Sequence, residues 1–220
     1  MQKVFDSFFK KDFWIKENLR YADPYFRLEK CARIVNNIAG NEPRDLLDIG
    51  CGPGSLQELL NDNINYFGID IAIHKPAPNL MERDLSQEEI GYDDRTFDLV
   101  VAGGLFEYMG GLQEKKLAEV KAVLRKNGRF ILTYTNFSHV NDSRIDHSIY
   151  NNIQHIEEFK RGLECFFTVD SWFPSSHNWQ CSEPRRKLLK VLQLPLQRRL
   201  PLISRWLAVN YFFICSHRDH

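Results

Sequence analysis

Apolar residues along this chain follow two spacings in alternation. Helical spacing begins at Pro24 and runs to residue 39 before Gly40, and it returns at 55–60 and 112–126. Between these patterns lie short apolar runs of the kind found in buried parallel strands, at 45–49, 64–70, 79–82, 97–102 and 129–135. The first two thirds of the chain therefore predicts alternating strands and helices.

The pattern loosens after residue 136 and then predicts a helix at 153–163 and strands at 165–173 and 207–215. Strands that alternate with helices indicate a doubly wound α/β fold. No internal repeat or linker divides the sequence, so we expect a single domain, 1–220. Within it, 1–40 would form an amino-terminal helical lid or cap, 45–135 the central core, and 136–220 the substrate-side segment and final strands.

Composition narrows the function classes. The 29 basic and 29 acidic residues cancel, which argues against nucleic acid as a partner. The five scattered cysteines include no C-x-x-C pair, so we expect free thiols in a cytoplasmic protein. Charged residues and prolines interrupt the most apolar late stretch, and no transmembrane segment is expected.

One glycine-rich turn follows the first apolar run, in the segment Asp48-Ile49-Gly50-Cys51-Gly52-Pro53-Gly54. Glycines let the backbone bend sharply and approach a ligand closely. The helix expected after the turn would present unpaired N–H groups and a partial positive charge. This arrangement predicts a site for a nucleotide or a carboxylate.

The same turn has two other interpretations. A dinucleotide site with the G-x-G-x-x-G spacing would need glycine where the chain has Ser55. Asp48 also suits a cationic ligand better than a pyrophosphate, because like charges repel. A strand-to-helix turn with incidental glycines is the remaining alternative.

The segment 46–54 resembles the first signature of class I S-adenosylmethionine-dependent methyltransferases. Further segments are similar to later signatures in the same order, at Asp70, at Asp84-Leu85, at 97–108 and at 117–135. The resemblance implies S-adenosylmethionine as cofactor and S-adenosylhomocysteine as product. It also implies a three-layer fold with a mostly parallel seven-stranded sheet of order 3-2-1-4-5-7-6, an antiparallel last strand, and helices on both faces.

The same resemblance implies the residues that would hold the cofactor. Asp70 would bind the two ribose hydroxyls, Asp84 and Leu85 would read the adenine, and Ile71 would pack on its other face. The glycine turn and the end of the fourth strand would lie beside the methionine part of the cofactor. The implied cofactor-binding residues are Asp48, Gly50, Cys51, Gly52, Gly54, Asp70, Ile71, Asp84, Leu85, Ala102 and Gly103.

The residue that would activate the acceptor does not carry across, because Tyr108 stands where many relatives have histidine. A sulfonium cofactor needs no metal, and a hydroxyl acceptor would be helped by a base such as histidine. The catalytic candidates are His177, His139 and Tyr108, and the acceptor-binding candidates are Glu107, Asn136, Tyr134 and Trp179. A looser likeness of 134–139 and 173–179 to uncharacterised bacterial methyltransferases of polysaccharide assembly favours O-methylation of a small molecule or glycan.

Several alternatives stay open. The aromatic residues within 5–14 could close over the cofactor or simply dock on the sheet. Segment 185–205, which mixes arginines and lysines with leucines, could touch an anionic membrane surface weakly or could be a solvated connection. The protein could instead methylate protein or nucleic acid, or bind the cofactor without turnover, and it could be a monomer or a homodimer.

Overall fold

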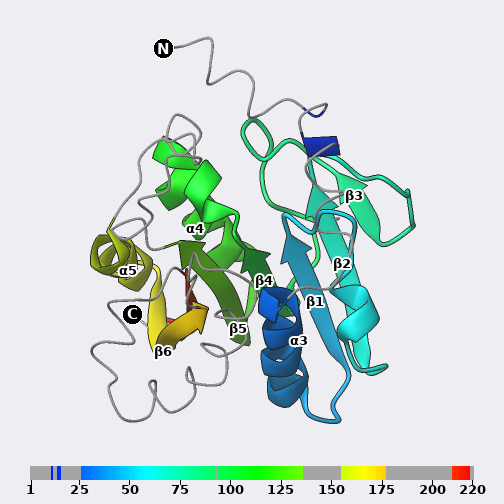
Figure 1. Ribbon diagram of the computed structural model, residues 1–220, viewed down its shortest axis with the longest axis horizontal. Coiled ribbons are helices and arrows are strands. Elements are labelled where there is room, and N and C mark those ends of the chain that lie inside the picture. Colours follow the sequence, from blue (N-terminus) through cyan, green and yellow to red (C-terminus); the bar gives the residue numbers. More distant parts are fainter. Residues whose placement is uncertain are drawn as a thin grey trace, which may run out of the picture.

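The computed structural model describes residues 11, 14–15, 26–92, 94–135, 155–176 and 210–218. Its centre is a seven-stranded sheet of order β3-β2-β1-β4-β5-β7-β6 (Figure 1). The strands β1 to β5 pair in parallel, and β7 pairs antiparallel with both β5 and β6. The predicted strand order and the antiparallel last strand are therefore confirmed. The strands are β1 (Arg44–Ile49), β2 (Ile64–Asp70), β3 (Leu80–Glu82), β4 (Phe97–Gly103), β5 (Leu124–Thr135), β6 (Phe167–Ser176) and β7 (Asn210–His217).

Helices cover both faces of the sheet. Successive strand residues point to opposite sides, so apolar side chains on both faces are buried under helices. Leu46 of β1 packs with α3 (Phe26–Ala39), whereas its neighbour Leu47 belongs to the cluster that includes α4 (Gln113–Val123) and α5 (Ile156–Glu164). The three helices and the sheet are seen in Figure 1. No helix among the described residues is long and apolar enough to cross a membrane. The predicted three-layer arrangement is confirmed.

Two predicted helix boundaries differ from the structure. The helical pattern at 55–60 forms only a 3-10 turn, η2 (Gln57–Leu59), so no regular helix follows the glycine turn. The pattern at 112–126 ends at Val123, and Asn127 and Gly128 lie inside β5 instead of ending the helix. A Cβ atom on Gly128 would lie 2.8 Å from the Asp98 carbonyl oxygen and 2.9 Å from that of Arg125. This glycine is required by close packing, and not as a helix stop.

The end of α3 follows the prediction. Gly40 has a φ of +59°, and its amide donates to the Asn36 carbonyl at 3.0 Å. A left-handed residue that closes the last turn in this way is most often glycine. The turn leads directly into β1 and so fixes where the first strand begins.

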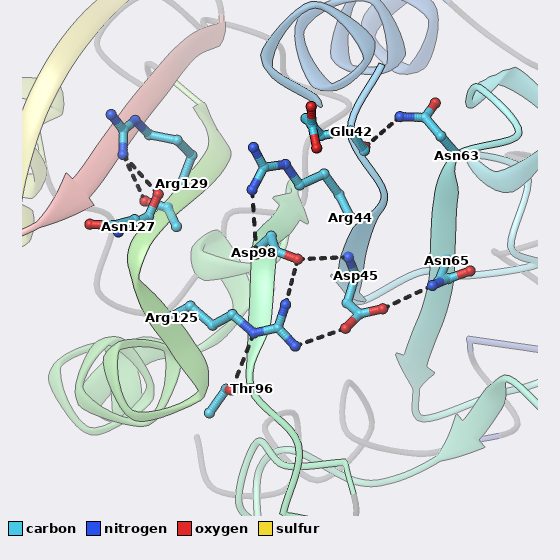
Figure 2. A network of polar contacts seen from close by, with 11 residues as sticks. Glu42, Arg44, Asp45, Asn63, Asn65, Thr96, Asp98, Arg125, Asn127 and Arg129 are labelled. Atoms are coloured by element: carbon cyan, nitrogen blue, oxygen red, sulfur yellow. Dashed lines mark hydrogen bonds and ion pairs between the residues drawn. The ribbon is translucent and has the colours of Figure 1, made fainter. Parts of the chain in front are cut away.

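The amino-terminal edge of the sheet carries a network of charged side chains, which we call the basal network: Arg44, Asp45, Asp98 and Arg125 (Figure 2). The Arg125 guanidinium donates to Asp98 at 2.6 Å and to Asp45 at 2.8 Å, and Arg44 lies 3.7 Å from Asp98. The Asp45 amide also donates to Asp98 at 2.9 Å. Burial alone would raise the pKa of Asp98, but this amide and Arg125 outweigh it and lower that pKa. The network joins β1, β4 and β5 at the edge opposite the glycine turn.

Candidate functional site

The glycine turn lies at the carboxyl edge of the parallel strands, where the chain order of the sheet changes direction. From β1 the chain continues to β2 and β3 on one side, while β4 and β5 lie on the other. In open α/β sheets, ligands bind beside such a switch point at the carboxyl ends of the strands. The predicted turn therefore lies at the ligand-binding position of its fold class.

Three glycines shape this turn. Gly50, Gly52 and Gly54 have φ values of +74°, +56° and +82°, which other residues rarely adopt. A Cβ atom on Gly50 would also lie 3.2 Å from Leu105 Cδ1, in the loop after β4. The absence of side chains here lets the ends of β1 and β4 approach each other.

The amides of the turn already have protein partners. Those of Gly50 and Cys51 donate to the Ile69 carbonyl at 2.8 and 3.1 Å, and that of Gly54 donates to Cys51. Since no regular helix follows, the expected helix N-terminus does not contribute to the site. This part of the sequence interpretation is corrected: the site is formed by the glycine bend and nearby carboxylates.

Asp70 ends β2 directly beside the turn. Its two carboxylate oxygens accept hydrogen bonds from the amides of Gly52 and Ala72, at 2.8 and 2.9 Å. These bonds fix the orientation of the carboxylate. Its assignment to the ribose hydroxyls stays a prediction, and the position and orientation fit that task.

Asp48 lies beneath the turn and is only 5% exposed. Its Oδ2 accepts a hydrogen bond from the Tyr66 hydroxyl at 2.9 Å. Burial raises the pKa of Asp48 to about 7; the bond from Tyr66 opposes the rise, and the charge of Asp70 adds to it. Sequence reasoning missed Tyr66, since nothing in the local pattern shows that its hydroxyl reaches back to β1.

The remaining predicted cofactor residues surround the same edge. Leu85 is buried and Ile71 is half-buried, while Ala102 is buried at the end of β4. Gly103 is exposed, and a Cβ atom there would meet no described residue within 4 Å. Asp84 differs from expectation in one respect, because its Oδ1 already accepts bonds from the Ser86 amide and hydroxyl at 2.9 and 2.6 Å. No described residue fills the space beside Gly103, next to the turn.

Glu107 is the carboxylate on the predicted acceptor side, in η3 (Phe106–Tyr108) after β4. It is 3% exposed, and its Oε1 accepts bonds from the Thr135 amide and hydroxyl, both at 2.9 Å. Its Oε2 is buried and has no hydrogen-bond partner among the residues that the structure describes. Burial raises the pKa of Glu107, against its own backbone amide, the charge of Arg27 and the bonds from Thr135. A buried acceptor oxygen without a donor is costly unless something else supplies one.

Arg27 lies close to this carboxylate and was not singled out from the sequence. A Cβ atom on Gly104, whose φ is +74°, would lie 2.8 Å from Arg27 Nη1. The absence of that atom lets the guanidinium lie directly against the backbone after β4. Arg27 comes from the first turn of α3, so the contact is one of tertiary structure and leaves no local sequence signal.

Tyr108 meets the amino-terminal segment. Its ring makes an edge-to-face contact with Trp14, at 5.0 Å between centroids and an interplanar angle of 87°. Lys11 reaches Glu82 at the end of β3. These two contacts place residues 11 and 14 on opposite sides of the switch point, near β3 and after β4 respectively.

The other acceptor and catalytic candidates are not brought to this edge by the described structure. Tyr134 is fully buried, with its ring stacked on Phe159 at 3.8 Å, so it is a core residue. The remaining candidates, Asn136, His139, His177 and Trp179, lie outside the described residues, as does segment 185–205.

Comparison with known proteins adds a family. A family model described as a methyltransferase domain matches residues 23–191. An uncharacterized protein of Methanocaldococcus jannaschii is 28% identical over 158 residues, which cover 62% of this chain and 60% of that protein. The chain thus spans less than two thirds of this curated relative.

Solved structures share the fold at low identity. A complex between the Haloferax volcanii Trm112 methyltransferase activator and a candidate methyltransferase matches with a TM-score of 0.65 and 16% identity, over 95% of this chain and 96% of that one. A Burkholderia thailandensis 1,6-didemethyltoxoflavin-N1-methyltransferase, with bound substrate and S-adenosylhomocysteine, matches with a TM-score of 0.57 and 15% identity, over 88% and 79%. The glycine bend, the oriented Asp70 and the open space beside Gly103 are consistent with the S-adenosyl group named in the second structure.

Proposed function

Because the chain belongs to the methyltransferase domain family, with S-adenosylmethionine as its cofactor, we propose that it methylates an oxygen of a small-molecule or glycan acceptor. The observation that carries the proposal is the arrangement of carboxylates at the carboxyl edge. Asp48, Asp70 and Glu107 are all buried there. An edge rich in buried carboxylates favours a cationic ligand, and the sulfonium of this cofactor is a cation.

Bound S-adenosylmethionine supplies an electrophilic methyl group, so the protein has mainly to align the acceptor and exclude water. Gly103 leaves space for the acceptor at the end of β4. Glu107 would accept a hydrogen bond from the acceptor through Oε2, the oxygen without a partner in the described part of the chain. Thr135 holds the other oxygen and so fixes the direction of that bond.

A small acceptor fits the amino-terminal contacts better than a protein or nucleic acid does. Trp14 lies against Tyr108 immediately after the acceptor side, and Lys11 against Glu82 beyond the turn. Residues held on both sides of the switch point leave less room for a broad macromolecular surface. The sequence Gly103-Gly104-Leu105-Phe106 also lacks the Asn/Asp-Pro-Pro-Tyr type of motif that amino-group transfer to bases would favour.

The proposal is tested with methyl-labelled S-adenosylmethionine and a panel of acceptors. Monosaccharides, oligosaccharides and phenols would be compared with mixed tRNA and an unfolded protein. We expect label on a hydroxyl of a small acceptor. Label only on tRNA or protein would overturn the proposed acceptor class. Binding of S-adenosylhomocysteine without transfer to any member of the panel would favour the non-catalytic alternative.

Glu107→Gln tests the acceptor contact, because glutamine keeps an oxygen for Thr135 but loses the charge. A hydrogen bond to a charged group is worth about 1.5–3 kcal/mol, so we expect the acceptor KM to rise about tenfold to a hundredfold. The dissociation constant of S-adenosylhomocysteine should stay unchanged.

Tyr108→Phe, compared with Trp14→Ala, tests whether the Tyr108 hydroxyl or only its ring contact with Trp14 affects methyl transfer. The histidines His139 and His177 remain the candidate bases, tested by alanine substitution and the pH profile of kcat.

A further inference from the structure

A buried acid cluster lies directly beneath the glycine turn and consists of Asp48, Cys51, Tyr66 and Asp70, all less than 9% exposed. The Tyr66 hydroxyl donates to Asp48, and the Gly52 amide donates to Asp70. The two carboxyl groups therefore share one small volume, where each charge is felt by the other.

The groups that face Asp48 do not neutralise its charge. From β2 it meets Tyr66 and Asp70, from the turn Cys51, and from α3 Cys31. Burial raises the pKa of Tyr66 and of both thiols, and the charge of Asp48 adds to each rise, so these groups stay neutral. Among the described residues, no basic side chain forms an ion pair with Asp48. The positive charge of Arg27, also on α3, acts on Cys31 and on Glu107.

The two carboxyl groups also differ in their hydrogen bonds. Asp70 receives two backbone amides, whereas Asp48 receives one bond from a neutral hydroxyl. Asp48 is thus the member of the pair that gains most from binding a proton when no cation is near. Burial raises its pKa to about 7, within the physiological range.

We propose that Asp48 is the residue through which this site distinguishes S-adenosylmethionine from S-adenosylhomocysteine: its carboxyl group holds a proton in the absence of a cation and releases that proton to solvent when the sulfonium cofactor binds. The two ligands share the same ammonium and carboxylate groups and differ in the sulfonium charge. An added positive charge near a carboxyl group favours its ionised form. This inference rests on the proposed function only for the identity of the cofactor.

The same coupling has a consequence for turnover. Methyl transfer to a hydroxyl breaks the sulfur–methyl bond, forms an oxygen–methyl bond and releases the hydroxyl proton, so that the sulfonium becomes a neutral thioether. Asp48 then loses the nearby sulfonium charge and, near neutral pH, takes up a fraction of a proton, while the acceptor releases one to solvent. Around neutral pH, the ionised form of Asp48 therefore favours a fresh cofactor over the spent product.

The test is calorimetric titration of the full chain with each ligand in two buffers of different ionisation enthalpy. Near pH 6.5, where an Asp48 carboxyl of pKa about 7 is mostly protonated, S-adenosylmethionine should release about half a proton or more, and S-adenosylhomocysteine much less. The ratio of the two affinities should rise about fivefold to tenfold between pH 6 and pH 8 and level off above, because only one ligand requires Asp48 to ionise. Titration of the shared ammonium group cancels in this ratio.

Two variants make the test specific to Asp48. Asp48→Asn keeps an oxygen for the Tyr66 hydroxyl, and it should abolish the difference in proton release and flatten the affinity ratio. Tyr66→Phe removes the donor that stabilises the charged form, and it should move the pH midpoint upward. Asp98→Asn, at the opposite edge, should leave proton release unchanged.

Each outcome separates the inference from the proposed function. Equal proton release by the two ligands, or a difference that persists in Asp48→Asn, would overturn the inference while leaving the cofactor assignment intact. Absence of binding by either ligand would overturn both the cofactor assignment and the inference.

Discussion

At the amino edge of the sheet, Asp98 is bonded to Arg125 and to the amide of Asp45, whereas at the carboxyl edge Asp48 receives one bond from a tyrosine hydroxyl. The pKa of Asp98 is lowered, and that of Asp48 is raised to about 7. Both residues lie on neighbouring parallel strands. The difference therefore comes from what surrounds each carboxyl group.

The comparison assigns stability to the amino edge of the sheet and ligand binding to the carboxyl edge. The basal network compensates its charges within the protein, so it holds three strands together and needs no ligand. The carboxyl edge keeps buried charge that the protein itself compensates poorly. Such uncompensated groups cost folding free energy and are concentrated at functional sites. Changes at the two edges should therefore have opposite signatures.

The largest expected effect is a gain of stability from Asp48→Asn. A pKa raised from its ordinary value of 3.8 to about 7, at 1.36 kcal/mol per unit, corresponds to about 4 kcal/mol. Since the folded pKa lies above the unfolded one, this cost is absent at acidic pH, grows as pH rises from about 4 to 7, and is constant above. Urea unfolding of the ligand-free protein across this range measures it. A variant no more stable than wild type at pH 8 would contradict the comparison.

The next effect is a loss of cofactor binding from Asp70→Ala. Asp70 is expected to accept one charge-assisted hydrogen bond from each of the two ribose hydroxyls, and each bond is worth about 1.5 kcal/mol or more. Losing both should weaken the affinity for S-adenosylhomocysteine by about a hundredfold or more. Asp98→Ala is the matched control at the other edge, where we expect lower stability and unchanged affinity. Calorimetry and urea unfolding of both variants separate the two edges, and equal affinity of Asp70→Ala and wild type would remove Asp70 from the site.

A pair of glycine substitutions sharpens the contrast. A Cβ atom on Gly128, in the basal region, would press on two backbone oxygens, and overpacking of this kind costs about 1–3 kcal/mol. A Cβ atom on Gly103 would meet none of the described residues within 4 Å. Gly128→Ala should therefore lower the free energy of unfolding and keep ligand affinity. Gly103→Ala should leave the free energy of unfolding unchanged and weaken ligand binding. If Gly128→Ala weakened binding and Gly103→Ala lowered stability instead, the two edges would not be divided between stability and binding.

The smallest effect is that of Arg125→Met. The Arg125 side chain is 42% exposed, so solvent screens its bonds, and we expect a loss of about 1 kcal/mol. The pKa of Asp98 is lowered in the folded state, so the network stabilises above the ordinary pKa of aspartate and this contribution disappears as pH falls through the folded value. High salt should reduce the loss as well. A penalty independent of both pH and salt would indicate packing and not charge.

Local signals explain why much of the fold was predictable. The apolar runs of β1, β2 and β4 and the glycine stop after α3 are read from neighbouring residues, and the structure agrees with them to within one or two positions. The glycine turn was found for the same reason. In contrast, the helical pattern at 55–60 is overridden, since the chain there forms only η2.

Contacts distant in sequence explain what was missed. Arg27 reaches the backbone after β4 from α3, and Tyr66 reaches Asp48 from the neighbouring strand β2. The sequence makes Tyr134 an acceptor candidate because a flat ring suits a sugar or an aromatic acceptor. Tyr134 shares the face of Leu132 and Phe130, two and four residues earlier, and this alternation already indicates the core.

The position of β7 between β5 and β6 has a consequence for how the chain folds during synthesis. Residues 210–217 pair with β5 on one side and β6 on the other, although both partners come earlier in the chain. Until these residues leave the ribosome, β5 and β6 each have an unpaired edge facing the gap, and unpaired edges invite association between chains. We therefore expect nascent chains stalled before residue 210 to depend on chaperones, whereas the half formed by β1 to β4 can already assemble.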